Sequence, residues 1–323
     1  MSALDVDAIA EGVRRRDRAA LGRALTLMES EAPGHRGASQ ALLSRLLPLA
    51  GGAIRVGITG PPGVGKSTII DALGAMLLER GHHVGVLAVD PSSGRSGGSI
   101  LGDKTRMAKL ARDERAFVRP SPSGGALGGV AQKTREARVV LEAARFDVVL
   151  IETVGVGQSE TEVEGMVDHF VALLLPGSGD ELQGIKRGVL ELADVVAVNK
   201  ADGELSAAAE RTRHQHALAI KLLGEKRPGW TPPVLSLSAR APARVEALWS
   251  AIEAHRAFLE GEGALAEQRA EQDVRWMWRI VDDGARQRLR ADPKVAALAA
   301  ELERDVRDGR AEPRLAALRL LDA

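Results

Sequence analysis

One short segment carries the residues best suited to hold phosphate groups. It reads Gly-Pro-Pro-Gly-Val-Gly-Lys-Ser over positions 60–67, which matches the P-loop pattern G-x-x-x-x-G-K-[ST]. Its glycines let backbone N–H groups turn inward around phosphates, and a helix that begins there adds favourable partial charge. We expect the Lys66 ammonium to reach the terminal phosphates and the Ser67 hydroxyl to bind Mg²⁺. The segment predicts a nucleoside triphosphate site formed by Gly60, Pro61, Pro62, Gly63, Val64, Gly65, Lys66, Ser67 and Thr68.

A second motif, Asn199-Lys200-Ala201-Asp202, indicates which base is bound. It has the N-K-x-D form found in GTPases. The Asp202 carboxylate could accept two hydrogen bonds from guanine, whereas adenine offers neither donor at that edge and would leave the carboxylate unpaired. Ser238 and Ala239 follow the next apolar run and resemble the loop that supports guanine. We therefore expect GTP and GDP to contact Asn199, Lys200, Asp202, Ser238 and Ala239.

Acidic residues near these motifs are candidates for the metal surroundings. Glu152 ends an apolar run and is followed by Gly155, where GTPases usually carry D-x-x-G. Asp90 and Asp103 bound a Gly/Ser-rich loop that the γ-phosphate and Mg²⁺ could order, although Asp103 could equally be a helix N-cap. We assign the metal to Ser67, Asp90, Asp103 and Glu152, catalysis to Lys66 with these three acids, and γ-phosphate sensing to the Gly155 N–H.

The residue that activates the attacking water is not evident. Val156 stands where many GTPases place a water-orienting glutamine, and Gln158 lies two residues further on. We expect slow hydrolysis by the protein alone. Two loops, 121–129 and 176–188, would also lie near the nucleotide if the strands are parallel, since ligands bind at carboxyl strand ends.

The elements that must position these motifs alternate along the chain. Short apolar runs, typical of strands buried on both faces, alternate with helical stretches, which favours an α/β fold with a mostly parallel sheet. The expected strands are 54–59, 84–89, 116–118, 147–153, 169–175, 195–198 and 234–237. Helical segments precede and follow them. We expect an N-terminal helical extension at 1–52, a P-loop GTPase domain at 53–260 and a C-terminal helical dimerisation arm at 261–323.

Composition excludes several classes of protein. The 323 residues hold 44 basic and 44 acidic side chains, so no general basic field favours nucleic acid. Cysteine is absent, which removes disulfides, thiolate metal sites and cysteine nucleophiles and fits a cytoplasmic location. No apolar run approaches the roughly 18 residues of a membrane span, and the first residues form no signal core. We expect a cytoplasmic protein that binds neither nucleic acid nor membrane.

Taken together, these blocks resemble the ArgK/MeaB family of methylmalonyl-CoA mutase-associated GTPases. The resemblance rests on 60–68, 89–93, 98–107, 152–160, 199–202 and 271–278. It implies a homodimeric, GTP-dependent chaperone of an adenosylcobalamin-dependent acyl-CoA mutase, which gates cofactor loading and protects or reactivates the mutase. It also implies that 176–188 is an additional switch. The chain lacks the cobalamin-binding pattern D-x-H-x-x-G, so it is not itself the mutase. Which acyl-CoA mutase is the client stays open.

Two other functions compete with this interpretation. One is a metal-insertion GTPase, for which the close histidine pairs His82-His83 and His214-x-His216 would be the candidate ligands. Adjacent side chains diverge in a turn, and residues two apart on a helix do not face each other, so solvated histidines are the simpler interpretation. The other is a P-loop kinase, the older ArgK transport-kinase assignment. A kinase has no need to select guanine, so the N-K-x-D motif argues against it.

Overall fold

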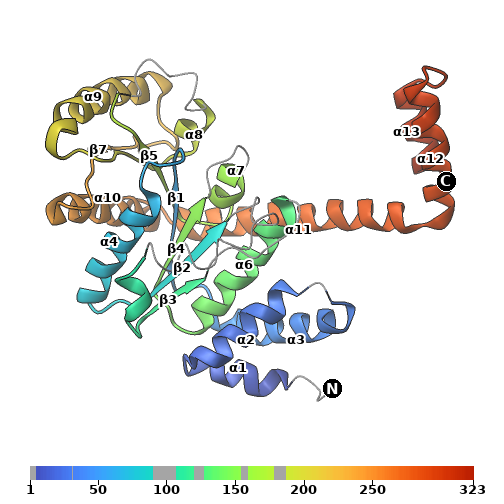
Figure 1. The fold of residues 1–323 in the computed structure, drawn as a ribbon, viewed down its shortest axis with the longest axis horizontal. Helices are drawn as coiled ribbons and strands as arrows, with labels where there is room; N and C mark the ends of the chain where they lie inside the picture. The colour runs from blue at the N-terminus through green and yellow to red at the C-terminus, as the bar shows by residue number, and fades with distance from the viewer. Residues whose placement is uncertain (1–4, 31, 90–106, 120–126, 154–158, 178–186) are drawn as a thin grey trace. The chain divides into compact units, whose positions relative to one another are not determined.

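A seven-stranded parallel sheet forms the centre of this computed structural model, which describes residues 5–30, 32–89, 107–119, 127–153, 159–177 and 187–323 (Figure 1). The strand order is β3-β2-β4-β1-β5-β6-β7, and every adjacent pair is parallel. The strands are β1 (Ile54–Thr59), β2 (Val84–Val89), β3 (Ala116–Arg119), β4 (Val148–Thr153), β5 (His169–Leu174), β6 (Val195–Val198) and β7 (Val234–Ser236). The predicted α/β fold and mostly parallel sheet are confirmed.

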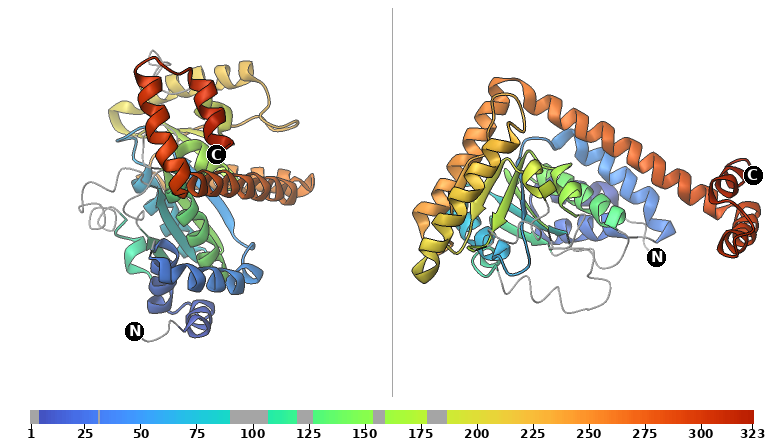
Figure 2. Two further views of the ribbon diagram at one scale, coloured as in Figure 1. Left: turned by 90° about the vertical axis from the view of Figure 1, so that its right-hand side faces the viewer. Right: turned by 90° about the horizontal axis from the view of Figure 1, so that it is seen from above.

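Helices cover both faces of the sheet, which is why the strands are mostly apolar on both faces rather than only at alternate positions. On one face, α4 (Lys66–Glu79) and α10 (Pro242–Gly261) bury their apolar sides against the central strands. The other face is covered by α6 (Leu127–Ala143), α7 (Ser159–Glu164), α8 (Arg187–Leu192) and α9 (Ser206–Leu223). Figure 2 shows the same layers from two further directions.

The order of the strands places the P-loop at the centre of the sheet. β1 lies between β4 and β5, so the chain moves to one side of β1 after α4 and to the other side after α7. Ligands of open parallel sheets bind at such a switch point, beyond the carboxyl ends of the strands. The ends of β1, β4 and β6 carry the three predicted motifs.

The N-terminal helices pack mainly onto α6 and also contact the edge strand β3, where Arg18 donates to the Ala116 carbonyl at 3.1 Å. They are α1 (Val6–Arg14), α2 (Arg18–Glu29) and α3 (Arg36–Leu46), and they share one apolar core with α6. Asp5 and Asp17 cap α1 and α2, since each side chain accepts a hydrogen bond from a backbone N–H of the first turn. Short 3₁₀ turns complete the connections at η1 (Pro33–His35), η2 (Leu47–Leu49), η4 (Leu110–Arg112) and η5 (Gly203–Leu205).

The chain divides into two compact units, residues 1–265 and 266–323. The second unit holds most of α11 (Ala264–Ala291), together with α12 (Pro293–Arg307) and α13 (Pro313–Leu321). Leu302 of α12 and Ala316 of α13 are buried where these two helices pack together. The finer division into 1–52, 53–260 and 261–323 stays a prediction. Across the described part of the chain, no helix combines the length and apolar character needed to cross a membrane.

Candidate nucleotide site

The P-loop is a tight turn in which two positions require glycine. It connects β1 to α4, and Gly60 and Gly65 have φ angles of 150° and 96°. A Cβ on Gly60 would lie 2.6 Å from the Leu173 carbonyl oxygen, and one on Gly65 would lie 2.9 Å from Asn199 Nδ2. Such contacts and positive φ values exclude other side chains. Gly65, in the left-handed region, is the N-cap of α4, which begins at Lys66.

Lys66 is held inside the loop that it is expected to serve. Its ammonium donates to the Gly60 carbonyl at 2.7 Å and to the Pro61 carbonyl at 3.3 Å, and the residue is 8% exposed. Burial lowers the pKa of Lys66, while the charges of Glu152 and Glu160 oppose that shift. Among the described residues, the Lys66 ammonium forms hydrogen bonds to these two carbonyl oxygens and to no carboxylate. Phosphate oxygens could therefore replace the carbonyls without breaking an ion pair.

Ser67 and Glu152 together fit a magnesium ion. The Ser67 hydroxyl donates to Glu152 Oε1 at 2.9 Å, which joins the first turn of α4 to the end of β4. Mg²⁺ prefers oxygen ligands and is commonly bound by one or two protein oxygens together with phosphate oxygens and water. The described residues hold no cluster of three or more His, Cys, Asp or Glu side chains with metal-site geometry.

Two threonines that sequence reasoning missed connect the strands behind this site. Thr153 Oγ1 donates to Thr59 Oγ1 at 2.8 Å, and both residues are buried. Thr59 precedes the P-loop and Thr153 follows Glu152, so the bond fixes the distance between the phosphate loop and the metal acid. A threonine at each strand end is the only signal in the sequence, and it becomes informative once β1 and β4 are known to be neighbours.

The N-K-x-D motif lies at the end of β6, beside the P-loop. Asn199 Nδ2 donates to the Val64 carbonyl at 2.7 Å, which ties the base loop to the phosphate loop. Ser238 Oγ donates to Asp202 Oδ1 at 2.9 Å, and the backbone N–H of Ala201 donates to the Leu237 carbonyl at 3.0 Å. The two loops expected to hold guanine are thus joined by side-chain and backbone hydrogen bonds.

A hollow of about 430 Å³ lies between these loops. Its walls come from the P-loop and α4, from the N-K-x-D loop with η5, and from the loop after β7. The lining residues are Gly65, Thr68, Asn199, Lys200, Asp202, Gly203, Glu204, Leu205, Ser238, Ala239 and Arg240. Seven of the predicted nucleotide contacts, from three segments far apart in the sequence, therefore meet here: Gly65, Thr68, Asn199, Lys200, Asp202, Ser238 and Ala239.

Three predicted site residues, Asp90, Asp103 and Gly155, lie outside the described residues. Their assignments stay predictions. The remaining ones, from Gly60 to Thr68, Glu152, Asn199 to Asp202, Ser238 and Ala239, all lie at the carboxyl ends of β1, β4, β6 and β7 or in the first turn of α4.

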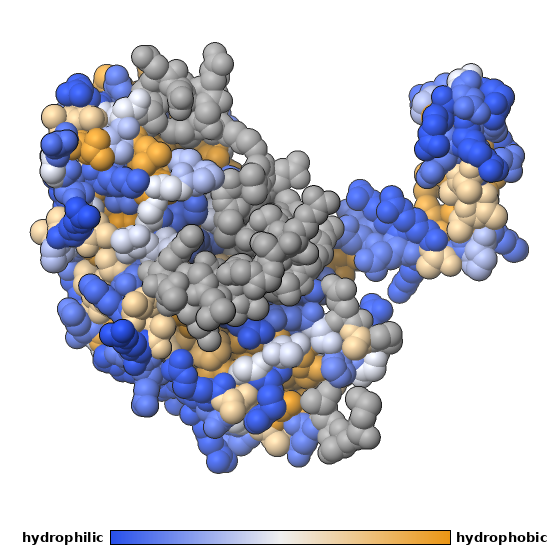
Figure 3. Space-filling view, viewed as in Figure 1, coloured by the Kyte–Doolittle hydropathy of each residue, from blue (hydrophilic) through white to orange (hydrophobic). Residues whose placement is uncertain are grey.

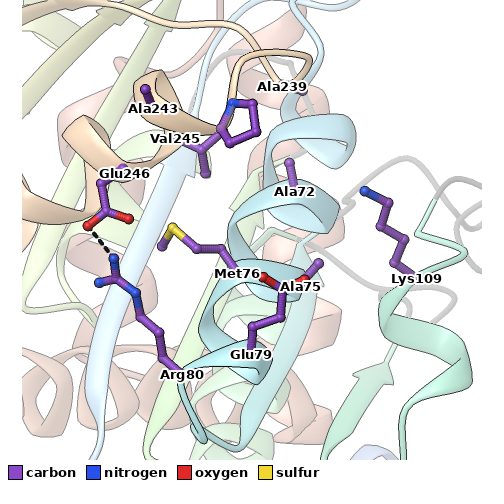
Figure 4. A pocket seen from close by; sticks show the side chains of 11 residues that line it. Ala72, Ala75, Met76, Glu79, Arg80, Lys109, Ala239, Ala243, Val245 and Glu246 are labelled. Carbon is purple, nitrogen blue, oxygen red and sulfur yellow. Dashed lines mark hydrogen bonds and ion pairs between the residues drawn. The ribbon is translucent and has the colours of Figure 1, made fainter.

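A second hollow, of about 480 Å³, lies between α4 and α10 (Figure 4). Its walls are mostly small or apolar and include Ala72, Met76 and Val245, and Arg80 forms an ion pair with Glu246. It contains no glycine-rich loop and none of the predicted phosphate-binding groups. We therefore place the nucleotide in the first hollow, although the second is slightly larger.

The two histidine pairs are not arranged as metal ligands. His82 Nδ1 lies 2.6 Å from Asp147 Oδ2, and His216 is buried while His214 is exposed on the same helix. Burial lowers the pKa of His216.

A P-loop at the end of β1, an acid at the end of β4 and N-K-x-D at the end of a further strand of the same parallel sheet define a P-loop GTPase. Comparison with known proteins agrees with this class and identifies a family within it. The family described as "Methylmalonyl Co-A mutase-associated GTPase MeaB" matches residues 21–294, and the chain belongs to this family.

Similar proteins extend over nearly the whole chain. A "Putative GTPase" of Caulobacter vibrioides is 56% identical over 321 residues, which cover 99% of this chain and 98% of the relative. The mouse "Methylmalonic aciduria type A homolog, mitochondrial" is 44% identical and covers 98% of this chain, with 79% of its own length matched. GTPase ArgK of Escherichia coli is 47% identical over 83% of this chain and 82% of its own.

A solved structure shares the fold along the full length. The crystal structure of an LAO/AO transport system kinase superposes with a TM-score of 0.81 at 35% identity, and the match covers 100% of this chain and 98% of that one. The protein is therefore a GTPase that binds GTP and GDP, and its family is described by association with methylmalonyl-CoA mutase.

Proposed function

We propose that this GTPase is a GTP-dependent chaperone of an adenosylcobalamin-dependent acyl-CoA mutase of the methylmalonyl-CoA mutase type. It gates loading of the cofactor and protects or reactivates the mutase, in the cytoplasm. The observation that carries the proposal is the family match over residues 21–294, to a family described as mutase-associated. The relative described as a methylmalonic aciduria type A homolog supports it, since that name refers to the same metabolite.

The phosphate half of the site would stabilise charge during hydrolysis. Lys66 would exchange its carbonyl partners for phosphate oxygens, and the backbone N–H groups of the P-loop would donate to them. Ser67 and Glu152 would hold Mg²⁺, which neutralises phosphate charge when bound. The bond between Ser67 and Glu152 keeps both oxygens together before the nucleotide arrives.

The base half of the site would select guanine. Asp202 faces the hollow with Oδ1 bound by Ser238, and its carboxylate retains acceptor capacity for the two N–H groups of the guanine edge. Asn199 would stabilise the base loop through its bond to the P-loop. The GTP preference follows from the chemistry of this edge, because a base without these donors would leave Asp202 desolvated and unpaired.

Hydrolysis would be slow without a partner. Val156 follows Gly155 in the sequence, where a water-orienting glutamine stands in many GTPases. A group supplied by the mutase complex would complete the site, as activating partners do for other GTPases. Asp90, Asp103 and the loop 176–188 are the segments through which we expect the nucleotide state to reach the client.

We also propose that the protein is a homodimer and that α11 contributes to the interface. Val274, Met277, Trp278 and Val281 are about half exposed, and their spacing of three or four residues puts them on one face of α11. The terminal helical unit also shows an apolar area among hydrophilic residues (Figure 3). Light scattering should give a dimer for the native chain, and Met277→Glu with Trp278→Glu should give a monomer that still binds GDP. A monomeric native chain at micromolar concentration would contradict this proposal.

The decisive experiment measures steady-state GTP hydrolysis by the full chain, alone and with a purified adenosylcobalamin-dependent mutase from the same source. Slow turnover that rises when the mutase is added supports the proposal. The Lys66→Ala variant mixed with the mutase is the matched control, because it shows whether the added hydrolysis belongs to this site. Unchanged turnover together with no detectable complex would overturn the chaperone function and leave a GTPase with another partner.

A kinase function deserves a separate test, because the structurally similar protein is described as a transport system kinase. Radiolabelled γ-phosphate from GTP should appear only as free phosphate, whether or not a candidate protein acceptor is present. Label retained on an acceptor would favour the kinase.

A further inference from the structure

Arg244 contacts the base loop from outside the predicted motifs. It lies in the first turn of α10, and its Nη1 donates to the Ala201 carbonyl oxygen at 2.6 Å. That carbonyl belongs to the peptide that joins Ala201 to Asp202. On its other side, Ala201 donates its N–H to the Leu237 carbonyl at 3.0 Å. The backbone leading into Asp202 is therefore held by a donor and by an acceptor from two different segments.

The orientation of this peptide decides where the Asp202 carboxylate points. Asp202 itself has an extended backbone, with φ −133° and ψ 164°, and rotation of the preceding peptide would swing its side chain. Ser238 restrains one carboxylate oxygen at 2.9 Å. The Arg240 guanidinium lies 3.6 Å from the other oxygen but is 88% exposed, so it restrains the carboxylate weakly. Arg244 supplies the restraint on the backbone.

The helix that carries Arg244 is itself rigidly attached. Val245, Leu248 and Trp249 are buried in the core on the α4 face of the sheet. Glu246 forms an ion pair with Arg80 at the end of α4, drawn as a dashed line in Figure 4. A donor on a fixed helix restrains its acceptor more than a donor on a mobile loop does.

From this arrangement we propose that Arg244 is a positioning residue for guanine selectivity, acting through the peptide before Asp202. It touches neither the base nor the phosphates. The inference rests on the proposed contact between Asp202 and guanine and goes beyond it, because it assigns part of the base preference to a residue outside N-K-x-D and the Ser238 loop. The expected effect is on discrimination between bases and not on the chemical step.

The test compares affinity for GDP and for IDP, whose hypoxanthine lacks the exocyclic amine, using the full-length chain. Arg244→Ala should lower the preference for GDP over IDP about fivefold, the size expected for one lost hydrogen bond. The kcat at saturating GTP should stay within about twofold of the native value, since P-loop geometry is unchanged. Arg244→Lys should restore most of the preference, because an ammonium can still donate to the carbonyl.

Two further variants keep the outcome clear. Arg244→Met retains the apolar stem and removes the donor, in case alanine disturbs folding. Arg256→Ala, which removes a partly exposed arginine of the same helix paired with Glu260, should leave both affinities unchanged. An unchanged GDP/IDP ratio in folded Arg244→Ala or Arg244→Met, or an equal loss of both affinities, would overturn the inference.

The same measurement separates this inference from the base contact on which it rests. If the native protein binds GDP and IDP equally, the contact between Asp202 and guanine is wrong. If the native protein discriminates and Asp202→Ala abolishes the preference while Arg244→Met retains it, the contact is right and the role of Arg244 is wrong.

Discussion

The two ends of the sheet both contain buried charged groups, but they use them differently. At the carboxyl ends of the strands, the buried Lys66 is bound by backbone carbonyls, and the half-buried Asp202 faces a hollow. At the amino ends, the charges satisfy one another. Arg55 at the start of β1 donates to Glu142 of α6 at 2.7 and 3.1 Å, and its own backbone N–H donates to Asp168 at 3.0 Å.

A second set of buried charges at the amino ends of the strands is also paired internally. Asp194, just before β6, accepts from Lys226 at 2.8 Å and from the Phe170 N–H at 2.8 Å. His169 and His255 have their Nδ1 atoms 2.9 Å apart beside it. Buried charges therefore occur at both ends of the strands, so burial of charge alone does not identify a functional site. The distinguishing feature is whether the charged group has a buried counter-charge or, like Lys66 and Asp202, has neutral or solvent-exposed partners.

We call the amino ends of the strands, where the charges pair with one another, the structural end. Glu142→Gln removes a buried carboxylate there and is expected to have the largest effect of the variants. It leaves Arg55 and Arg138 buried without their carboxylate, which typically costs about 3–5 kcal/mol of stability. Urea denaturation should show the loss, while GDP affinity of the folded fraction stays unchanged. Glu11→Gln, which removes two solvent-exposed ion pairs, is the control and should change stability by less than about 1 kcal/mol. A matching loss in the control would refute the distinction.

We call the carboxyl ends of the strands, which carry the nucleotide site, the functional end. Lys66→Ala should abolish most of the hydrolysis there. Removing a cation that stabilises developing phosphate charge should lower kcat by a factor of about 10²–10³. Thermal stability should be retained, because among the described residues the hydrogen bonds of the Lys66 ammonium go to backbone carbonyls and to no carboxylate. Lys109→Ala, which removes an exposed lysine near α4, serves as the control for the assay. Native turnover in Lys66→Ala would remove the assigned site.

Asp202→Asn tests the proposed contact between Asp202 and the base at the functional end. Loss of charge-assisted hydrogen bonds costs about 1.5–3 kcal/mol, so GDP affinity should fall roughly tenfold to a hundredfold. Affinity for XDP should rise, because the asparagine amide can donate to the oxygen that replaces the guanine amine. Competition binding with both nucleotides measures this exchange. An unchanged GDP/XDP ratio would place the base elsewhere.

The smallest expected effect is a pH dependence of stability at the structural end. Burial lowers the pKa of His169 to about 4, and burial also lowers the pKa of His255. Between pH 6.5 and 4 the unfolded chain therefore binds more protons than the folded one, so stability falls as pH falls. Urea unfolding at pH 5.5 should show about 1 kcal/mol less stability than at pH 7.5 from His169. His169→Gln should flatten this dependence; an equal slope in that variant would show that other groups cause it.

Sequence patterns were most informative where a structure depends on adjacent residues. The P-loop could be predicted because its glycines, Lys66 and Ser67 form one turn, and N-K-x-D could be predicted for the same reason. Strand positions followed from continuous apolar runs, with ends within one or two residues of those found.

What the amino-acid sequence determined by itself was thus the class of fold, the phosphate loop and the preference for guanine, since each depends on local backbone geometry or on the chemistry of a short motif. Only the tertiary structure decided that Thr59 meets Thr153, that Arg55 meets Glu142 and that Arg244 reaches the peptide before Asp202. These pairs lie 43 to 94 positions apart. The order and register of parallel strands bring them together, and no spacing within the chain records that order.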